Sequence, residues 1–83
     1  MKPTRQQIEE DIKSLVKEHV IFERSVELSD RIIEDLGFDS LDVIELVCEL
    51  EEFYDIYIED ADVPKYNTVE EWVNCVETLT NNA

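Results

Sequence analysis

The 83-residue sequence is poor in the residues that build special sites, with one glycine, two prolines, two cysteines and one histidine. The two cysteines form no C-x-x-C pair and have no metal-ligand spacing, which argues against a zinc site or a disulfide scaffold. No apolar run exceeds three residues, so no segment reads as a membrane span, and no targeting segment is evident. We expect a cytoplasmic protein with free thiols, while the sequence leaves a bridge between Cys48 and Cys75 open.

Positive charge is also scarce, because 22 acidic residues face 7 Lys and Arg, which gives a net charge of −15. The stretch from residue 32 to residue 64 contains no Lys or Arg. It holds twelve acids: Glu34, Asp35, Asp39, Asp42, Glu45, Glu49, Glu51, Glu52, Asp55, Glu59, Asp60 and Asp62. Such a run repels nucleic acid and anionic lipid, and it weakens the compact state by self-repulsion. A solvated surface is the simple explanation, and docking onto partners with basic surfaces is the functional one.

The length suits one domain, and 43% apolar and 35% charged residues are typical of a folded chain. A domain of this size buries only about 60% of its unfolded surface, so a large catalytic pocket is not expected. We predict a single, monomeric domain over residues 1–83 that is not an enzyme, with order from about 4 to 80 and a tail at 81–83.

Helical periodicity appears in three places. Thr4 and Gln7 have capping-box spacing and open a first helix that ends near His19. A second helix is predicted from 39–40 to about Tyr54, and a third main helix begins at the capping box of Thr68 and Glu71. The apolar positions of the first and last helices are Ile8, Ile12, Leu15, Val16, Val69, Trp72, Val73, Val76 and Leu79.

The connections complete the expected architecture. Residues 20–37 show no clean period and read as a long loop that packs over the bundle, and such loops are usually functional. Residues 55–58 alternate like a strand but have no partner strand, so we predict a loop. Residues 59–63 form one short helical turn that Pro64 stops. The fold class is therefore all-α: a four-helix bundle with three main helices, a short third helix and a long first loop.

The second helix has two apolar sectors at 100° per residue. Val43, Leu46, Val47, Leu50 and Tyr54 form the core stripe. The second sector, which holds Leu41, Ile44 and Cys48, lies more than a quarter-turn away and is bracketed by Glu45, Glu51, Glu52 and Asp55. A covering loop would explain it, and so would a docking surface with an apolar centre and a charged rim.

The segment from Asp35 to Asp42 leads into this helix. Gly37 permits a turn that other residues resist, and Ser40 lies at the helix start. Free backbone N–H groups and the helix dipole favour a phosphate there. A serine at this position is more often a simple N-cap, so these residues alone leave both readings open.

The run Asp39-Ser40-Leu41 after Leu36-Gly37, followed by Asp42, Ile44, Glu45 and Leu46, resembles the phosphopantetheine attachment motif of acyl carrier proteins, and the similarity in spacing extends from Ile8 to Val76. The resemblance implies a four-helix bundle whose Ser40, flanked by Asp39 and Leu41, bears 4'-phosphopantetheine. The arm would carry acyl thioesters in fatty acid or polyketide-type biosynthesis. The implied partners are a phosphopantetheinyl transferase and acyl-transferring or synthase enzymes.

The resemblance also implies roles along the helix. Positions for partner contact are Leu41, Asp42, Ile44, Glu45, Cys48, Glu51 and Glu52. Positions that line an acyl pocket are Val43, Leu46, Val47, Tyr54 and Ile58. The chain departs from the common family pattern at Phe38, Cys48, Phe53 and Glu59, which leaves the pathway undefined.

The sequence leaves two other function classes to consider. An acidic interaction module or nucleic-acid mimic without a prosthetic group would explain the charge but not the placement of Gly37 and Ser40. An enzyme using Ser40 as nucleophile would need an adjacent base, and we expect the one histidine, His19, to be exposed at the end of the first helix. No metal site is predicted, because residues 49–62 lack the glycine of a calcium loop, although weak non-specific divalent binding is expected.

Overall fold

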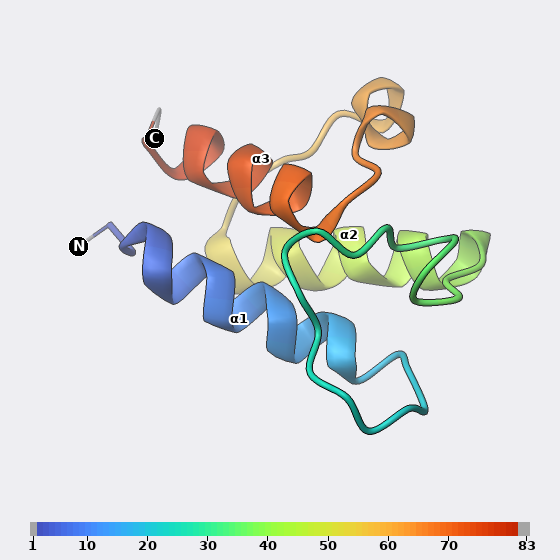
Figure 1. The fold of residues 1–83 in the computed structure, drawn as a ribbon. Helices are drawn as coiled ribbons and strands as arrows, with labels where there is room; N and C mark the ends of the chain where they lie inside the picture. The colour runs from blue at the N-terminus through green and yellow to red at the C-terminus, as the bar shows by residue number, and fades with distance from the viewer. Residues whose placement is uncertain (1, 82–83) are drawn as a thin grey trace.

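The computed structural model describes residues 2–81 and contains three α-helices and one 3₁₀-helix (Figure 1). These are α1 (Arg5–Lys17), α2 (Ser40–Tyr54), η1 (Asp60–Lys65) and α3 (Val69–Asn81). In the part of the chain that is described there is no strand, only an isolated bridge between Arg31 and Thr68. The predicted all-α fold with a short third helix is confirmed.

Helix α1 starts at the predicted capping box. The Thr4 hydroxyl accepts a hydrogen bond from the backbone N–H of Gln7, and the Gln7 side chain accepts one from the backbone N–H of Thr4. At the same end, the Arg5 guanidinium donates to Asn74 at 2.6 Å and to Glu77 at 2.9 Å, both on α3. These contacts hold α1 beside α3, and the start of α1 and the end of α3 lie at the same end of the molecule (Figure 1).

A single core draws on all three α-helices and on the loops. Fully buried side chains come from the predicted helix stripes: Ile8, Ile12, Val16, Leu46, Leu50, Val69, Trp72, Val73 and Val76. Leu15 and Leu79 are only half-buried at its edge. Burying an aliphatic side chain of this size contributes about 1.5–3 kcal/mol, so the core is the main source of stability.

The long first loop packs over the bundle as predicted. It buries Val26, Ile32, Leu36 and Phe38. Its backbone also caps α3, because the carbonyl of Asp30 accepts from the N–H of Val69 at 3.0 Å and that of Leu28 accepts from Glu70 at 2.9 Å. The first N–H groups of α3, which have no partner within the helix, are thereby satisfied.

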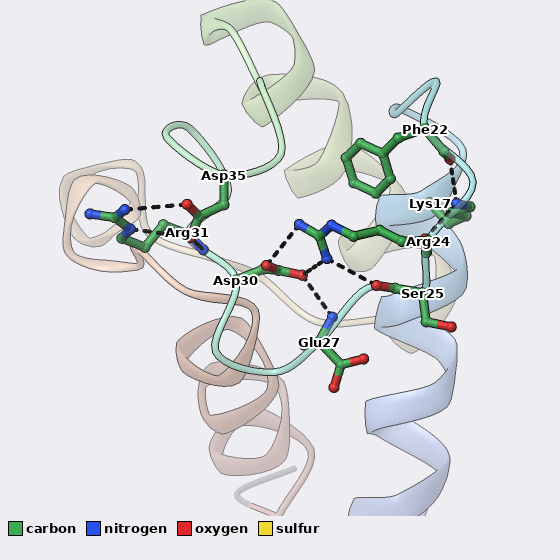
Figure 2. Close-up of polar contacts among 8 residues, drawn as sticks. All are labelled: Lys17, Phe22, Arg24, Ser25, Glu27, Asp30, Arg31 and Asp35. Carbon is green, nitrogen blue, oxygen red and sulfur yellow. Dashed lines mark hydrogen bonds and ion pairs between the residues drawn. The ribbon is translucent and has the colours of Figure 1, made fainter.

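Polar contacts within this loop, and between it and the last turn of α1, are drawn in Figure 2. The carboxylate of Asp30 accepts two hydrogen bonds from Arg24, at 2.9 and 3.0 Å, and one from the backbone N–H of Glu27 at 2.8 Å. The Lys17 ammonium, on the last turn of α1, donates to the carbonyls of Phe22 and Arg24. A bidentate pair between arginine and carboxylate is geometrically specific, so the loop presents a defined path into α2.

Other predictions can be compared with the observed bounds. Residues 56–59 form a loop, as expected. The prediction that Pro64 stops the short helix is wrong, because η1 continues through Pro64 to Lys65. A 3₁₀ turn suits the fixed φ of proline, and one missing N–H is tolerated in so short a helix. Asn81 belongs to α3 and not to the predicted tail, whose residues 82–83 lie outside the described residues.

The two cysteines are free, with Cys48 exposed and Cys75 buried, so the bridge that the sequence left open does not form. None of the described helices is long and apolar enough to cross a membrane.

Candidate functional site at the start of helix α2

The approach to Ser40 is shaped by a helical turn that ends at Gly37. The carbonyl of Arg31 accepts from the N–H groups of Asp35 and Leu36, and the N–H of Gly37 donates to the carbonyl of Ile33 at 3.2 Å. Gly37 has φ 76°, in the left-handed region that favours glycine. The predicted need for glycine at this turn is confirmed.

Helix α2 begins with two carboxylates that cap it reciprocally. The Asp39 carboxylate accepts from the backbone N–H of Asp42 at 2.8 Å, and the Asp42 carboxylate accepts from the backbone N–H of Asp39 at 3.1 Å. The hydrogen bond from the Asp39 backbone, followed by that from His19, lowers the pKa of Asp42. Asp39 is therefore the N-cap, and Ser40 is the first helical residue. The simple N-cap reading of Ser40 is wrong.

The hydroxyl of Ser40 is available for modification, because the residue is exposed and Asp39, not Ser40, caps the helix. The N–H groups of Ser40 and Leu41 have no partner within the helix, as at any helix start. A phosphodiester on Ser40 would lie in their positive field. The residues present thus fit a phosphate-linked group.

An exposed apolar patch follows on the same helix. Leu41 is 62% exposed and Ile44 is 58% exposed, and Cys48 is exposed beside them. The loop that could have covered this second apolar sector does not cover it. Among the predicted partner-contact acids, Glu45 and Glu52 are exposed.

The other two acids of that set are turned toward the protein. Asp42 bonds Asp39 and His19. Glu51 accepts a hydrogen bond from the backbone N–H of Ile58 at 2.9 Å, which fixes the loop after α2. These two carboxylates hold the local structure, whereas Glu45 and Glu52 point charge at solvent.

A groove of about 430 Å³ lies between α2 and η1. Its wall includes Val43 and Val47, two of the predicted acyl-pocket residues, and also Val63 and Asp60 from η1. No role was predicted for Val63 from the sequence. The pattern that could have indicated one is an apolar residue inside an otherwise acidic short helix, directly before Pro64.

The remaining acyl-pocket residues lie elsewhere. Leu46 and Ile58 are buried in the core rather than in the groove wall. Tyr54 is half-buried on the side of α1, where its hydroxyl donates to the Asp11 carboxylate at 3.0 Å. Burial, followed by that hydrogen bond, raises the pKa of the Tyr54 phenol. The structure therefore brings together only Val43 and Val47 of the five.

The prediction that His19 is exposed is wrong. Its side chain is 12% exposed and packs against Phe38, with ring centroids 5.1 Å apart. Nδ1 lies 3.2 Å from Asp42 and Nε2 lies 3.1 Å from Glu49. Periodicity missed this because His19 follows α1 in a turn, where no helical face can be assigned.

His19, Asp42 and Glu45 could offer metal-ligand atoms within 4.8 Å of one another. Both ring nitrogens of His19 already face carboxylates. An imidazole that donates from both nitrogens is an imidazolium and has no lone pair for a metal. We assign no metal to this group.

The geometry defines a class of protein: a small helical domain that displays a serine hydroxyl, with no side-chain base bonded to it among residues 2–81, on an acidic helix with an exposed apolar patch. This is the form of a carrier domain. Residues 10–76 match the sequence profile of a family that is described as "phosphopantetheine attachment site".

Individual relatives agree. The acyl carrier protein of Campylobacter lari is 47% identical over 71 residues, which cover 84% of this chain and 92% of the relative. That of Campylobacter hominis is 39% identical over 74 residues, covering 88% and 94%. A solved structure from Mycobacterium tuberculosis, described as an acyl carrier protein, superimposes with a TM-score of 0.80 at 31% identity, covering 86% of this chain and 96% of that one. The chain belongs to the acyl carrier protein family, whose prosthetic group is 4'-phosphopantetheine.

Proposed function

We propose that Ser40 is the residue of this chain that bears 4'-phosphopantetheine, and that the arm carries acyl groups between enzymes of fatty acid or polyketide-type biosynthesis. The observation that carries the proposal is the placement of Ser40 as the first residue of α2, exposed and relieved of capping by Asp39. Of the side chains at this helix start, only Ser40 offers a hydroxyl. When bound, the arm supplies a terminal thiol that forms the thioester with the cargo.

The attachment is a phosphoryl-type transfer from coenzyme A by a separate transferase. A bond forms between the Ser40 oxygen and the phosphorus that bears pantetheine. The P–O bond to the nucleotide half breaks, adenosine bisphosphate leaves, and the hydroxyl proton passes to a base of the transferase. This chain contributes the displayed oxygen and the positive end of α2, which favours the negative phosphodiester product.

The chain itself performs no catalysis in this proposal. A serine nucleophile needs a base within hydrogen-bond reach, and both nitrogens of His19 are occupied by Asp42 and Glu49. Asp39 and Asp42 are also occupied, each with the other's backbone. These occupied groups support a carrier that is acted upon by other enzymes.

The groove between α2 and η1 is the proposed shelter for the cargo. Val43, Val47 and Val63 give it an apolar wall, and Glu51 and Asp60 stand at its rim. An acyl chain that leaves solvent for such a wall gains about 25 cal/mol per Å² of apolar surface buried. The buried positions of Leu46 and Ile58 form its floor in this proposal, and Tyr54 is left out.

Partners would dock on Leu41, Ile44 and Cys48, with Glu45 and Glu52 steering basic surfaces toward them. A transient interface with an apolar centre and charged rim needs no other feature. We further propose that the chain acts as one monomeric domain, and free thiols at Cys48 and Cys75 suit the reducing cytoplasm.

The test is intact mass spectrometry after incubation with coenzyme A, magnesium and a carrier-protein phosphopantetheinyl transferase. The wild-type chain should gain the mass of one phosphopantetheine group, and Ser40→Ala should gain none. Ser14→Ala is the matched control, because Ser14 is an exposed serine on α1 and its loss should leave the gain unchanged. Modification of Ser40→Ala at the wild-type rate would refute the assignment.

A further inference from the structure

His19 joins two elements beside the proposed attachment site. It follows α1 and reaches α2 at two points about two turns apart, through Asp42 at 3.2 Å and Glu49 at 3.1 Å. Phe38 packs against the ring in a tilted contact. No other cation pairs with an α2 carboxylate among the described ion pairs, so His19 is the positive charge that links this acidic helix to the rest of the bundle.

The contact at Asp42 reaches Ser40 in two steps. One oxygen of Asp42 bonds the His19 ring, and the other accepts from the backbone N–H of Asp39. Asp39 and Asp42 are the capping pair on either side of Ser40. A change in how His19 holds Asp42 therefore acts on the first turn of α2, where the hydroxyl is displayed.

The protonation state of the ring decides whether the contact attracts. An imidazolium donates from both nitrogens and satisfies both carboxylates. A neutral imidazole has one N–H, so its other nitrogen presents a lone pair to a carboxylate and that contact becomes repulsive. The neutral ring releases one of the two attachments to α2, and in either tautomer the contact with Asp42 loses the attraction between opposite charges.

The charges around the ring are acidic. Asp42 and Glu49 face it from α2, and Glu45 is the next acid on that helix. Phe38, from the segment before α2, is uncharged. The neighbouring cation Lys17 is held by the carbonyls of Phe22 and Arg24.

Burial is the largest single influence and lowers the pKa of His19, but the hydrogen bonds and charges of Glu49 and Asp42 together outweigh it and raise the pKa above 6.5. The stabilising contact is therefore fully present below pH 6.5 and is lost as the pH rises through the folded-state pKa.

We propose that His19 is a positioning residue for Ser40: its imidazolium ties the first turn of α2 to the end of α1, so that attachment of the arm to Ser40 slows when the ring loses its proton. This inference rests on the proposed function of Ser40. A transferase must hold the hydroxyl in line with the phosphorus of coenzyme A, and a loosened helix start has to be ordered again on docking.

The experiment compares attachment rates of the full chain and two variants from pH 6 to pH 9. His19→Gln keeps a polar side chain without the charge, and His19→Lys keeps a cation throughout this range. Taking the ratio of rates at each pH cancels the transferase's own pH dependence. The ratio of wild type to His19→Gln should be about ten or more at pH 6, the size of one charge-assisted hydrogen bond, and should fall to about one above the folded-state pKa.

The lysine variant provides the rescue. The ratio of His19→Lys to His19→Gln should stay above one and show no such fall. A wild-type ratio that is constant with pH, or a lysine variant that behaves like the glutamine variant, would overturn the positioning role. A purely structural role would change the rates of both variants equally at every pH.

A readout without the transferase separates this inference from the proposed function. The NMR chemical shifts of the His19 ring protons should report a pKa above 6.5. Across that titration, the protection factor of the Asp42 amide should fall several-fold in the wild type but not in His19→Gln. If the wild type never gains the arm, or Ser40→Ala gains it, the proposed function fails. Amide protection then still tests whether His19 holds the first turn of α2. If modification of Ser40 proceeds but neither protection nor rate ratio follows the titration, only the positioning role fails.

Discussion

Asp39 and Asp42 exchange two hydrogen bonds across Ser40, each carboxylate accepting from the other's backbone N–H at 2.8 and 3.1 Å. Ser40, which the family resemblance marks for modification, therefore lies in the chain between the two residues that cap its helix. Capping and display are divided between neighbouring residues, which frees the Ser40 hydroxyl.

Replacing Asp39 by Ala should lower the free energy of unfolding by about 1 kcal/mol, because an N-cap is lost. It should also slow arm attachment, since the lost cap is adjacent to Ser40. Thr4→Ala removes the equivalent cap of α1 and is the control. Urea unfolding should show similar losses for the two variants, and intact mass should show slower attachment only for Asp39→Ala. If Asp39→Ala and Thr4→Ala gained the arm at equal rates, the cap of α2 would have no role in the modification of Ser40.

Gly37→Ala should destabilise the protein by about 1 kcal/mol, because alanine resists a φ of 76°. An added Cβ would meet no atom within 4 Å, so the cost comes from the backbone alone. Gly37→Asn should cost less, since asparagine tolerates this region better. Urea unfolding of the three proteins checks the order. A larger loss for asparagine than for alanine would point to a side-chain clash instead.

Leu41→Ala and Ile44→Ala should weaken binding of the holo-protein to a partner synthase by about five-fold or more while changing unfolding free energy by less than about 0.5 kcal/mol. Both side chains are more than half exposed, so the fold loses little. Ile33→Ala is the control, because Ile33 is 55% exposed but lies in the loop. Titration calorimetry should show unchanged binding for that control. Equal weakening by all three would argue against a specific patch on α2.

Asp30→Asn should destabilise the protein at pH 7 by about 1 kcal/mol, because it weakens the hydrogen bonds to Arg24. The Arg24 hydrogen bond, partly opposed by burial, lowers the pKa of Asp30 below 3.8. Its contribution is therefore present above pH 3.8 and lost as the pH falls through the folded-state pKa. Urea midpoints of wild type and variant should converge in acid. Glu27→Gln, which keeps the backbone N–H that contacts Asp30, should show no such convergence.

The sequence predicted what short-range rules govern. The capping boxes at Thr4 and Thr68, the stripe of α1 and the turn at Gly37 follow from local spacing, and the structure confirms them. The sequence also marked Leu41 and Ile44 as a second apolar sector but left open whether a loop covers it, and the structure leaves both side chains exposed.

What could not be predicted depends on how distant segments meet. Asp30 and Leu28 cap α3 through their carbonyls, which any residue could supply. His19 lies in a turn, and its two carboxylates come from a helix more than twenty residues later. The separation of Tyr54 from Val43 and Val47 arises where α1 covers the end of α2. Helical periodicity assigns a face to each residue but does not say which element covers it.

Because Cys48 is exposed and Cys75 is buried, the number of reactive thiols depends on the state of the molecule. Burial raises the pKa of the Cys75 thiol, so this sulfhydryl is both shielded and poorly ionised. A bulky alkylating reagent should therefore label the folded bare chain once and the chain with a free pantetheine thiol twice. Loading of cargo returns the count to one, and denaturant exposes the Cys75 thiol, so stoichiometric labelling reports whether the thiol of the arm is free or occupied by cargo.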